Sequence, residues 1–210
     1  MSPALVGLVL ALGSAHLVAY GARSGAIAGV LKPLPVLALA WAVAHGPLAS
    51  GTYGERIVAG LLLSAIGDVC LAFPAGFLAG LSAFFLAHLG YIGAFAPGAV
   101  PTPAALVAAV LLAAFSLGML RYLWPHVASL RVPVTVYVAA LATMTWCAIA
   151  RALAPGAPAG ATAGAVGAVS FLVSDGVLAV DRFARPFAGA YAVVMATYYA
   201  AQLLIAASAL

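Results

Sequence analysis

The sequence predicts an all-α membrane protein, a polytopic bundle of about eight transmembrane helices in a single domain. Hydrophobic residues make up 67% of its 210 residues and charged residues only 6%, and the mean hydropathy is +1.22. Soluble domains carry roughly 25% charged residues, which keep their surfaces solvated. This composition excludes a soluble globular domain and a disordered chain. The net charge of +4 forms no basic cluster, which excludes a nucleic-acid-binding surface.

The number of helices follows from the lengths of the apolar runs, since a span needs roughly 20 mostly apolar residues. Dividing the chain at Pro/Gly clusters and charged residues predicts helices at residues 3–21, 32–48, 56–74, 77–96, 103–121, 132–151, 161–180 and 187–208. The second helix is expected to begin at Lys32 and Pro33, and the third to run from Arg56 to Pro74. The loops are short, so the function must reside inside the bundle.

Basic residues indicate how the bundle is oriented. Those near the odd-numbered connections are Arg23, Lys32, Arg121, Arg131, Arg182 and Arg185. The even-numbered connections carry only Arg56 and, at a span end, Arg151. Because cytoplasmic loops are enriched in Lys and Arg, we expect the odd connections in the cytoplasm and both termini outside.

The two halves of the chain resemble each other. The sequence Ile-Gly-Asp-Val-Cys-Leu-Ala around Asp68 pairs with Val-Ser-Asp-Gly-Val-Leu-Ala around Asp175, and Lys32 before Pro33 pairs with Arg131 near Pro133. The paired segments lie about one hundred residues apart in the sequence. This spacing predicts one transmembrane domain, residues 1–210, made of two four-helix repeats at 1–100 and 101–210. The alternative is chance similarity between two Ala/Leu-rich segments.

Two acidic residues, Asp68 and Asp175, lie inside apolar runs. Such a placement costs about 2.5–3.5 kcal/mol at the membrane centre, and intramembrane acids are usually functional. Each is six residues before the predicted end of its span, or roughly 9 Å from the same membrane surface. We therefore expect the two carboxyl groups to face a shared cavity. The alternative is that each is a structural polar group, bonded to a neighbouring helix.

Further polar residues occur at helical spacing within the spans. His88 and Tyr91 share one face of their helix, and Tyr191, Tyr198 and Gln202 form a stripe along the last span. The candidate substrate-binding residues are Lys32, His88, Tyr91, Ser174, Tyr191, Tyr198, Tyr199 and Gln202. The alternative for the rings and the amide is that they join helices by hydrogen bonds.

Lys32 is the only lysine and is expected at the cytoplasmic mouth of its span. A lysine at a helix N-terminus can hold a phosphate, although it can also serve only to anchor the span. The sequence has no His-x-x-x-His or Glu-x-x-His pair. We therefore expect neither a metal nor a cofactor.

Four short stretches occur together over nearly the whole chain. They are a Gly-Asp pair at Asp68, Ala-His-Leu-Gly-Tyr ending at Tyr91, Ser-Asp at Asp175, and Tyr-Tyr-Ala-Ala-Gln ending at Gln202. In this combination the sequence resembles the YhhN/TMEM86 family of lysoplasmalogenase-like membrane proteins. The resemblance implies hydrolysis of the vinyl ether bond of lysoplasmalogens to a fatty aldehyde and glycerophosphoethanolamine or glycerophosphocholine, in a bacterial inner (plasma) membrane. Asp68 and Asp175 match the family's acidic positions.

The residues agree with this chemistry. A vinyl ether is hydrolysed by protonation at carbon, followed by capture of an oxocarbenium ion by water. The reaction needs one carboxylic acid and one carboxylate, as in glycosidases. We expect Asp68 and Asp175 to share these roles, in an order that the sequence leaves open, with Lys32 holding the phosphate of a lysophospholipid that enters from the surrounding membrane lipids.

Two other classes of function fit the same pattern. A proton-coupled transporter for a small molecule or lipid would use the two Asp residues as a proton relay. A lipid-binding or structural membrane protein would tolerate their replacement by Asn with a loss of stability alone. The oligomeric state is open.

Overall fold

The protein is a bundle of helices, as its composition predicts. The computed structural model describes residues 1–210 apart from the side chain of Pro74. Its helices are α1 (Pro3–Gly21), α2 (Gly25–Leu31), α3 (Leu34–Ala44), α4 (Thr52–Leu71), α5 (Phe77–Phe95), α6 (Pro103–Leu123), α7 (Arg131–Ala152), α8 (Ala161–Ala179) and α9 (Ala190–Ala207). A π-helical turn, Val180–Ala184, extends α8.

Seven helical segments are long and apolar enough to cross a membrane, with α2 and α3 counted as one segment. The remaining long helix, α4, has 20 residues but carries Glu55, Arg56 and Asp68. It packs along α5 on one side and α3 on the other. We therefore treat α4 as the eighth span, which gives the polytopic bundle that the sequence predicts.

Helix starts follow from local chemistry. The Ser2 and Thr102 side chains accept hydrogen bonds from the backbone N–H groups of Leu5 (3.3 Å) and Ala105 (3.2 Å), which caps α1 and α6. In both helices a proline follows the cap, where its missing N–H costs nothing. The last helix, α9, begins differently. Gly189 before α9 has φ +83°, a left-handed conformation that favours glycine.

The second span differs from its predicted boundaries. It begins at Gly25 rather than at Lys32, and it is interrupted at Lys32 and Pro33 before α3 continues. Pro33 has no N–H to donate and its ring opposes a continuous helix, so the sequence signal that suggests a helix start marks a break inside the span. Lys32 consequently lies seven residues, or about 10 Å, beyond the start of α2. The predicted position at the mouth of the span is wrong.

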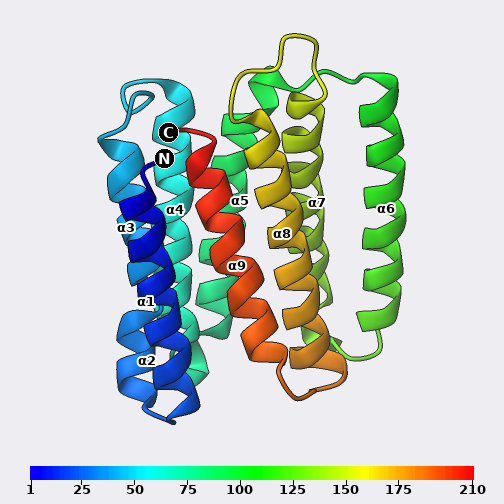
Figure 1. Cartoon of the computed structure of the whole chain (residues 1–210). Helices are drawn as coiled ribbons and strands as arrows, with labels where there is room; N and C mark the ends of the chain where they lie inside the picture. The colour runs from blue at the N-terminus through cyan, green and yellow to red at the C-terminus, as the bar shows by residue number, and fades with distance from the viewer.

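Figure 1 shows both chain termini at one end of the bundle, with the α1–α2, α4–α5, α6–α7 and α8–α9 connections at the other end. The odd-numbered connections therefore share one side. Helix α9 lies near the middle of the bundle and packs on α8, α3 and α1, whereas α6 lies at the edge and packs mainly on α7. The two Asp-bearing spans, α4 and α8, both end at the side of the odd connections. The predicted repeat at 1–100 and 101–210 stays a prediction.

Small residues allow the closest helix pairs. A Cβ atom at Gly60 of α4 would overlap the Tyr91 ring of α5, and one at Gly67 would lie 2.6 Å from the Phe84 ring. These glycines therefore let α5 aromatic rings lie against the α4 backbone. These contacts fix the register between α4 and α5, one next to Asp68 and the other about two turns before it along α4.

Candidate active site

A mostly apolar cavity opens among α4, α5, α6, α7, α8 and α9. It is partly open to the surroundings of the bundle. Most of its wall is aliphatic and aromatic. The polar and charged residues that line it are Lys32, Asp68, Ser116, Tyr137, Ser174, Asp175, Arg182 and Tyr198. Both intramembrane acids thus line one cavity.

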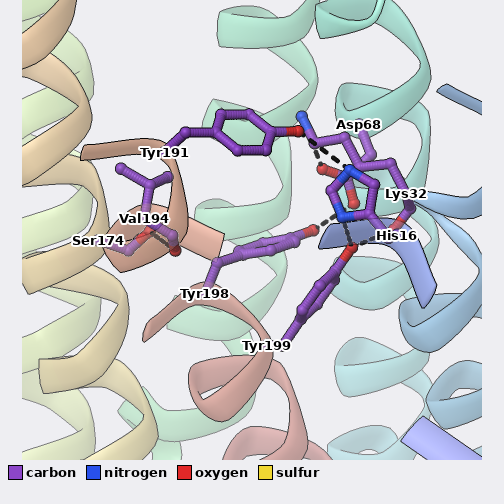
Figure 2. Close-up of polar contacts among 8 residues, drawn as sticks. All are labelled: His16, Lys32, Asp68, Ser174, Tyr191, Val194, Tyr198 and Tyr199. Atoms are coloured by element: carbon purple, nitrogen blue, oxygen red, sulfur yellow. Dashed lines mark hydrogen bonds and ion pairs between the residues drawn. The ribbon is translucent and has the colours of Figure 1, made fainter. Parts of the chain in front are cut away.

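Asp68 of α4 is held by two partners. Its Oδ1 atom lies 3.4 Å from Nζ of Lys32, and its Oδ2 atom accepts a hydrogen bond of 2.7 Å from the Tyr198 hydroxyl of α9. The carboxyl group is only 1% exposed. Figure 2 shows Lys32 and Tyr198 reaching Asp68 from different segments. Because a buried carboxylate is costly unless paired and hydrogen-bonded, these two contacts favour a charged Asp68.

Asp175 of α8 has a different environment. Its Oδ2 atom accepts a hydrogen bond of 2.5 Å from the Tyr137 hydroxyl of α7. The Lys32–Asp68 contact is the only ion pair among the side chains that the structure describes, so no cation neutralises Asp175. The two acids therefore share a cavity but have opposite electrostatic surroundings.

A second polar cluster lies behind Lys32 and is centred on His16 of α1, which is fully buried. The His16 Nε2 atom lies 3.0 Å from the Tyr191 hydroxyl, and Nδ1 lies 2.8 Å from the Tyr199 hydroxyl. The Tyr199 hydroxyl donates to the carbonyl oxygen of Lys32 at 3.0 Å. Because the Tyr199 hydroxyl donates its only proton to the Lys32 carbonyl oxygen, Nδ1 of His16 must donate to the Tyr199 oxygen. Nε2 of His16 then accepts a hydrogen bond from the Tyr191 hydroxyl.

This arrangement ties α1 and α9 to the break between α2 and α3, as Figure 2 shows. A carbonyl beside Pro33 would otherwise lack the regular helical hydrogen bonds. The cluster therefore holds the backbone of Lys32 in place and, with it, the side chain that meets Asp68. His16 is absent from the residues that the sequence predicts. Its position in the middle of an apolar span was the signal that could have revealed it.

Five predicted site residues lie outside the cavity wall: His88, Tyr91, Tyr191, Tyr199 and Gln202. Three of them, His88, Tyr91 and Gln202, also lie outside the His16 cluster. The Tyr91 hydroxyl donates to Oε1 of Gln202 at 2.7 Å, and both side chains are fully buried. The His88 ring packs edge-on against Tyr137 and Phe171, with ring centroids 5.0 and 4.9 Å apart. These side chains pack between helices and do not meet the two acids in the described structure.

The remaining predicted residues lie either in the cavity wall or in the His16 cluster. Ser174 lines the cavity, and its hydroxyl donates to the carbonyl oxygen of Val194 at 3.0 Å, which joins α8 to α9. Tyr198 meets Asp68, whereas Tyr191 and Tyr199 belong to the His16 cluster.

Three polar residues of the cavity wall are missing from the sequence prediction: Ser116, Tyr137 and Arg182. Tyr137 contacts Asp175 directly, and a tyrosine within an apolar span was the available signal. Arg182 lines the mouth, with its guanidinium 4.8 Å from the centre of the Phe77 ring. From the sequence, Arg182 indicates only which side of the bundle faces the cytoplasm. Among the described residues, no three His, Cys, Asp or Glu side chains gather closely enough to hold a metal ion.

Comparison with known proteins places these features in a family. The pattern of the YhhN family matches residues 27–209. Human lysoplasmalogenase TMEM86B is 43% identical over 189 residues, which cover 87% of this chain and 75% of that protein. A lysoplasmalogenase of Mycobacterium tuberculosis is 40% identical over 182 residues, 83% of this chain and 66% of that protein.

A third relative, lysoplasmalogenase TMEM86A of Bos taurus, is 35% identical over 191 residues, which cover 87% of this chain and 78% of that protein. No solved structure is significantly similar. The matches extend over most of the chain and include both Asp-bearing spans. The protein therefore belongs to the YhhN family.

Proposed function

We propose that this protein is a lysoplasmalogenase, which hydrolyses the vinyl ether bond of a lysoplasmalogen to a fatty aldehyde and a glycerophospho-headgroup. The observation that carries the proposal is the pair of acids in one apolar cavity, Asp68 next to a cation and Asp175 without one. The names and the 40–43% identity of the human and mycobacterial relatives support the same activity.

Asp175 is the proton donor in this mechanism. Desolvation in an apolar wall opposes a charged carboxyl group, and no cation offsets that effect at Asp175. A neutral Asp175 can give its proton to the outer carbon of the vinyl ether, which leaves an oxocarbenium ion on the carbon next to oxygen. Tyr137 fixes one oxygen of the carboxyl group, so that the other can face the substrate.

Asp68 is the carboxylate that stabilises the cation and takes a proton from the attacking water. Lys32 and Tyr198 keep it charged and oriented. Water then adds to the oxocarbenium carbon and forms a hemiacetal. As the hemiacetal collapses, its hydroxyl group gives a proton to Asp175. Protonated Asp68 gives its proton to the departing glycerol oxygen. Both acids return to their starting states, in the division of labour known from glycosidases.

The other predicted residues support this pair. Tyr198 and Ser174 line the cavity and would contact substrate or water. Tyr199 holds the Lys32 backbone directly, and Tyr191 acts on it through His16 and Tyr199. Tyr91, Gln202 and His88 hold the helices that carry the acids. In this account Lys32 serves Asp68 rather than the phosphate of the substrate.

We also propose that the protein lies in a bacterial plasma membrane with both termini outside. The basic residues of the odd connections support this orientation. The cavity mouth at Arg182 would then face the cytoplasmic surface, where a lysophospholipid from that leaflet could enter headgroup last.

Aldehyde release from a lysoplasmalogen by the purified protein in detergent tests the proposal. The double variant Asp68→Asn/Asp175→Asn, matched to the wild type by thermal unfolding, is the comparison. We expect release by the wild type and none by the variant. Folded wild-type protein that releases no aldehyde would refute the proposal, and movement of intact lipid across liposomes in that case would favour a transporter.

A further inference from the structure

We propose that Arg182 binds the phosphate of the substrate headgroup at the cavity mouth and thereby selects phosphate-bearing ether lipids. The inference rests on the proposed hydrolase function and adds a binding residue to it. It replaces the phosphate-binding role that the sequence suggests for Lys32.

Lys32 is poorly placed for the headgroup. Its side chain is 11% exposed and lies 3.4 Å from Asp68. A phosphate at Lys32 would have to compete with that carboxylate and approach a second negative charge. It would also have to enter the apolar bundle, where an incompletely paired phosphate is costly. The headgroup therefore requires a different cation nearer to the mouth.

Arg182 meets this requirement. It lies in the π-helical turn after α8, is exposed and lines the cavity. No carboxylate pairs with it among the described side chains. The neighbouring Asp181 instead accepts a hydrogen bond of 3.1 Å from the backbone N–H of Phe187, which holds that carboxylate in the following loop.

The guanidinium of Arg182 is held without losing its donors. It lies over the Phe77 ring of α5 at 4.8 Å, and Phe77 is packed edge-on against Phe183 with centroids 5.7 Å apart. Stacking on an aromatic face leaves the N–H groups in the guanidinium plane available to phosphate oxygens. A planar cation with such donors can bind phosphate in a bidentate way.

The spacing between Arg182 and Asp175 fits the substrate. The two residues are seven positions apart, about 10 Å along a helix, and both line the same cavity. In a lysoplasmalogen, the glycerol links the phosphorus to the outer vinyl carbon through about seven bonds, which span roughly 8 Å when extended. A phosphate at Arg182 therefore places the reacting carbon near Asp175, with the hydrocarbon chain continuing along the apolar wall.

The test compares a lysoplasmalogen with the matching 1-alkenylglycerol, which has the same vinyl ether but no phosphate. We expect Arg182→Gln to raise the KM for the lysoplasmalogen about 10- to 100-fold, because a charge-assisted hydrogen bond to the phosphate is lost. The kcat should stay within about twofold of the wild-type value. The KM for the alkenylglycerol should not change. Arg182→Lys should restore part of the difference, and Arg185→Gln, an exposed arginine outside the cavity lining, should behave as the wild type.

An equal rise in KM for both lipids, or no rise for either, would overturn the inference. Failure of the proposed function would look different, since the wild type would then cleave neither lipid. A binding measurement separates these cases. A non-cleavable saturated-ether lysophospholipid should raise the unfolding temperature of the wild type and of Arg185→Gln but not of Arg182→Gln, and equal stabilisation of all three would contradict a phosphate site at Arg182.

Discussion

The Lys32 ammonium group lies 3.4 Å from the Asp68 carboxylate inside the bundle, at the break between α2 and α3. This contact distinguishes the two acids of the cavity, because Asp175 has a tyrosine hydroxyl as its partner and no cation. A proline that interrupts a span thus places a positive charge next to one of two otherwise similar carboxyl groups.

Removing this cation should affect stability and turnover together. In Lys32→Met, Asp68 is left buried without its ion pair, and breaking one partner of such a pair costs about 3–5 kcal/mol. We expect a clear loss of thermal stability and of kcat for aldehyde release. The double variant Lys32→Met/Asp68→Asn should be more stable than Lys32→Met alone, because no unpaired charge remains. Additive losses in this double-mutant cycle would show that the pair does not couple.

Tyr137 should be needed for turnover more than for folding. Tyr137→Phe removes the hydroxyl that donates to Asp175 but keeps the ring that packs against His88. We expect kcat to fall about tenfold, which corresponds to one hydrogen bond to a reacting group, while KM stays similar. Tyr122→Phe serves as the control, since Tyr122 is 48% exposed and lies outside the cavity wall. A kcat for Tyr137→Phe equal to that of the control would exclude a role in the reaction.

The His16 cluster should act on the site through Lys32. Tyr199→Phe removes the hydrogen bond to the Lys32 carbonyl and leaves Nδ1 of His16 without its partner. Each unsatisfied buried group costs about 1–3 kcal/mol. We expect a lower unfolding temperature and a lower kcat, with no change in the KM preference for phosphate-bearing lipid. A shift in that preference would instead place Tyr199 in contact with the headgroup.

Much of the fold could be predicted because apolar runs, prolines and charges define spans directly. The break in the helix at Lys32 could not be predicted, because a Lys-Pro pair is typical of a helix start. A buried lysine is acceptable there only because of its tertiary contact with Asp68. For Tyr137 the sequence offers only the signal of a tyrosine within an apolar span, because its contact with Asp175 depends on how α7 packs on α8. His88 and Tyr91 share a helix face as expected, but that face packs against neighbouring helices rather than the cavity.

Close packing of α4 on α5 should tolerate no added methyl group. Gly60→Ala would drive a Cβ into the Tyr91 ring, and overpacking of this kind costs about 1–3 kcal/mol. Gly118→Ala in α6 is the matched control, because no atom lies within 4 Å of the new Cβ and alanine favours helix. Thermal unfolding in detergent should show a loss for Gly60→Ala and no loss for Gly118→Ala. Equal unfolding temperatures would mean that α4 and α5 are not packed as described.

The two acids provide the most direct test of the mechanism. The rate of fatty aldehyde release from a lysoplasmalogen should be measured for the wild type and for the single variants Asp175→Asn and Asp68→Asn, each shown to be folded. Loss of a general acid or base lowers the rate about 10²- to 10⁴-fold, so both variants should fall at least a hundredfold below the wild type. Turnover of either folded variant within twofold of the wild type would contradict the assignment of that aspartate to the reaction.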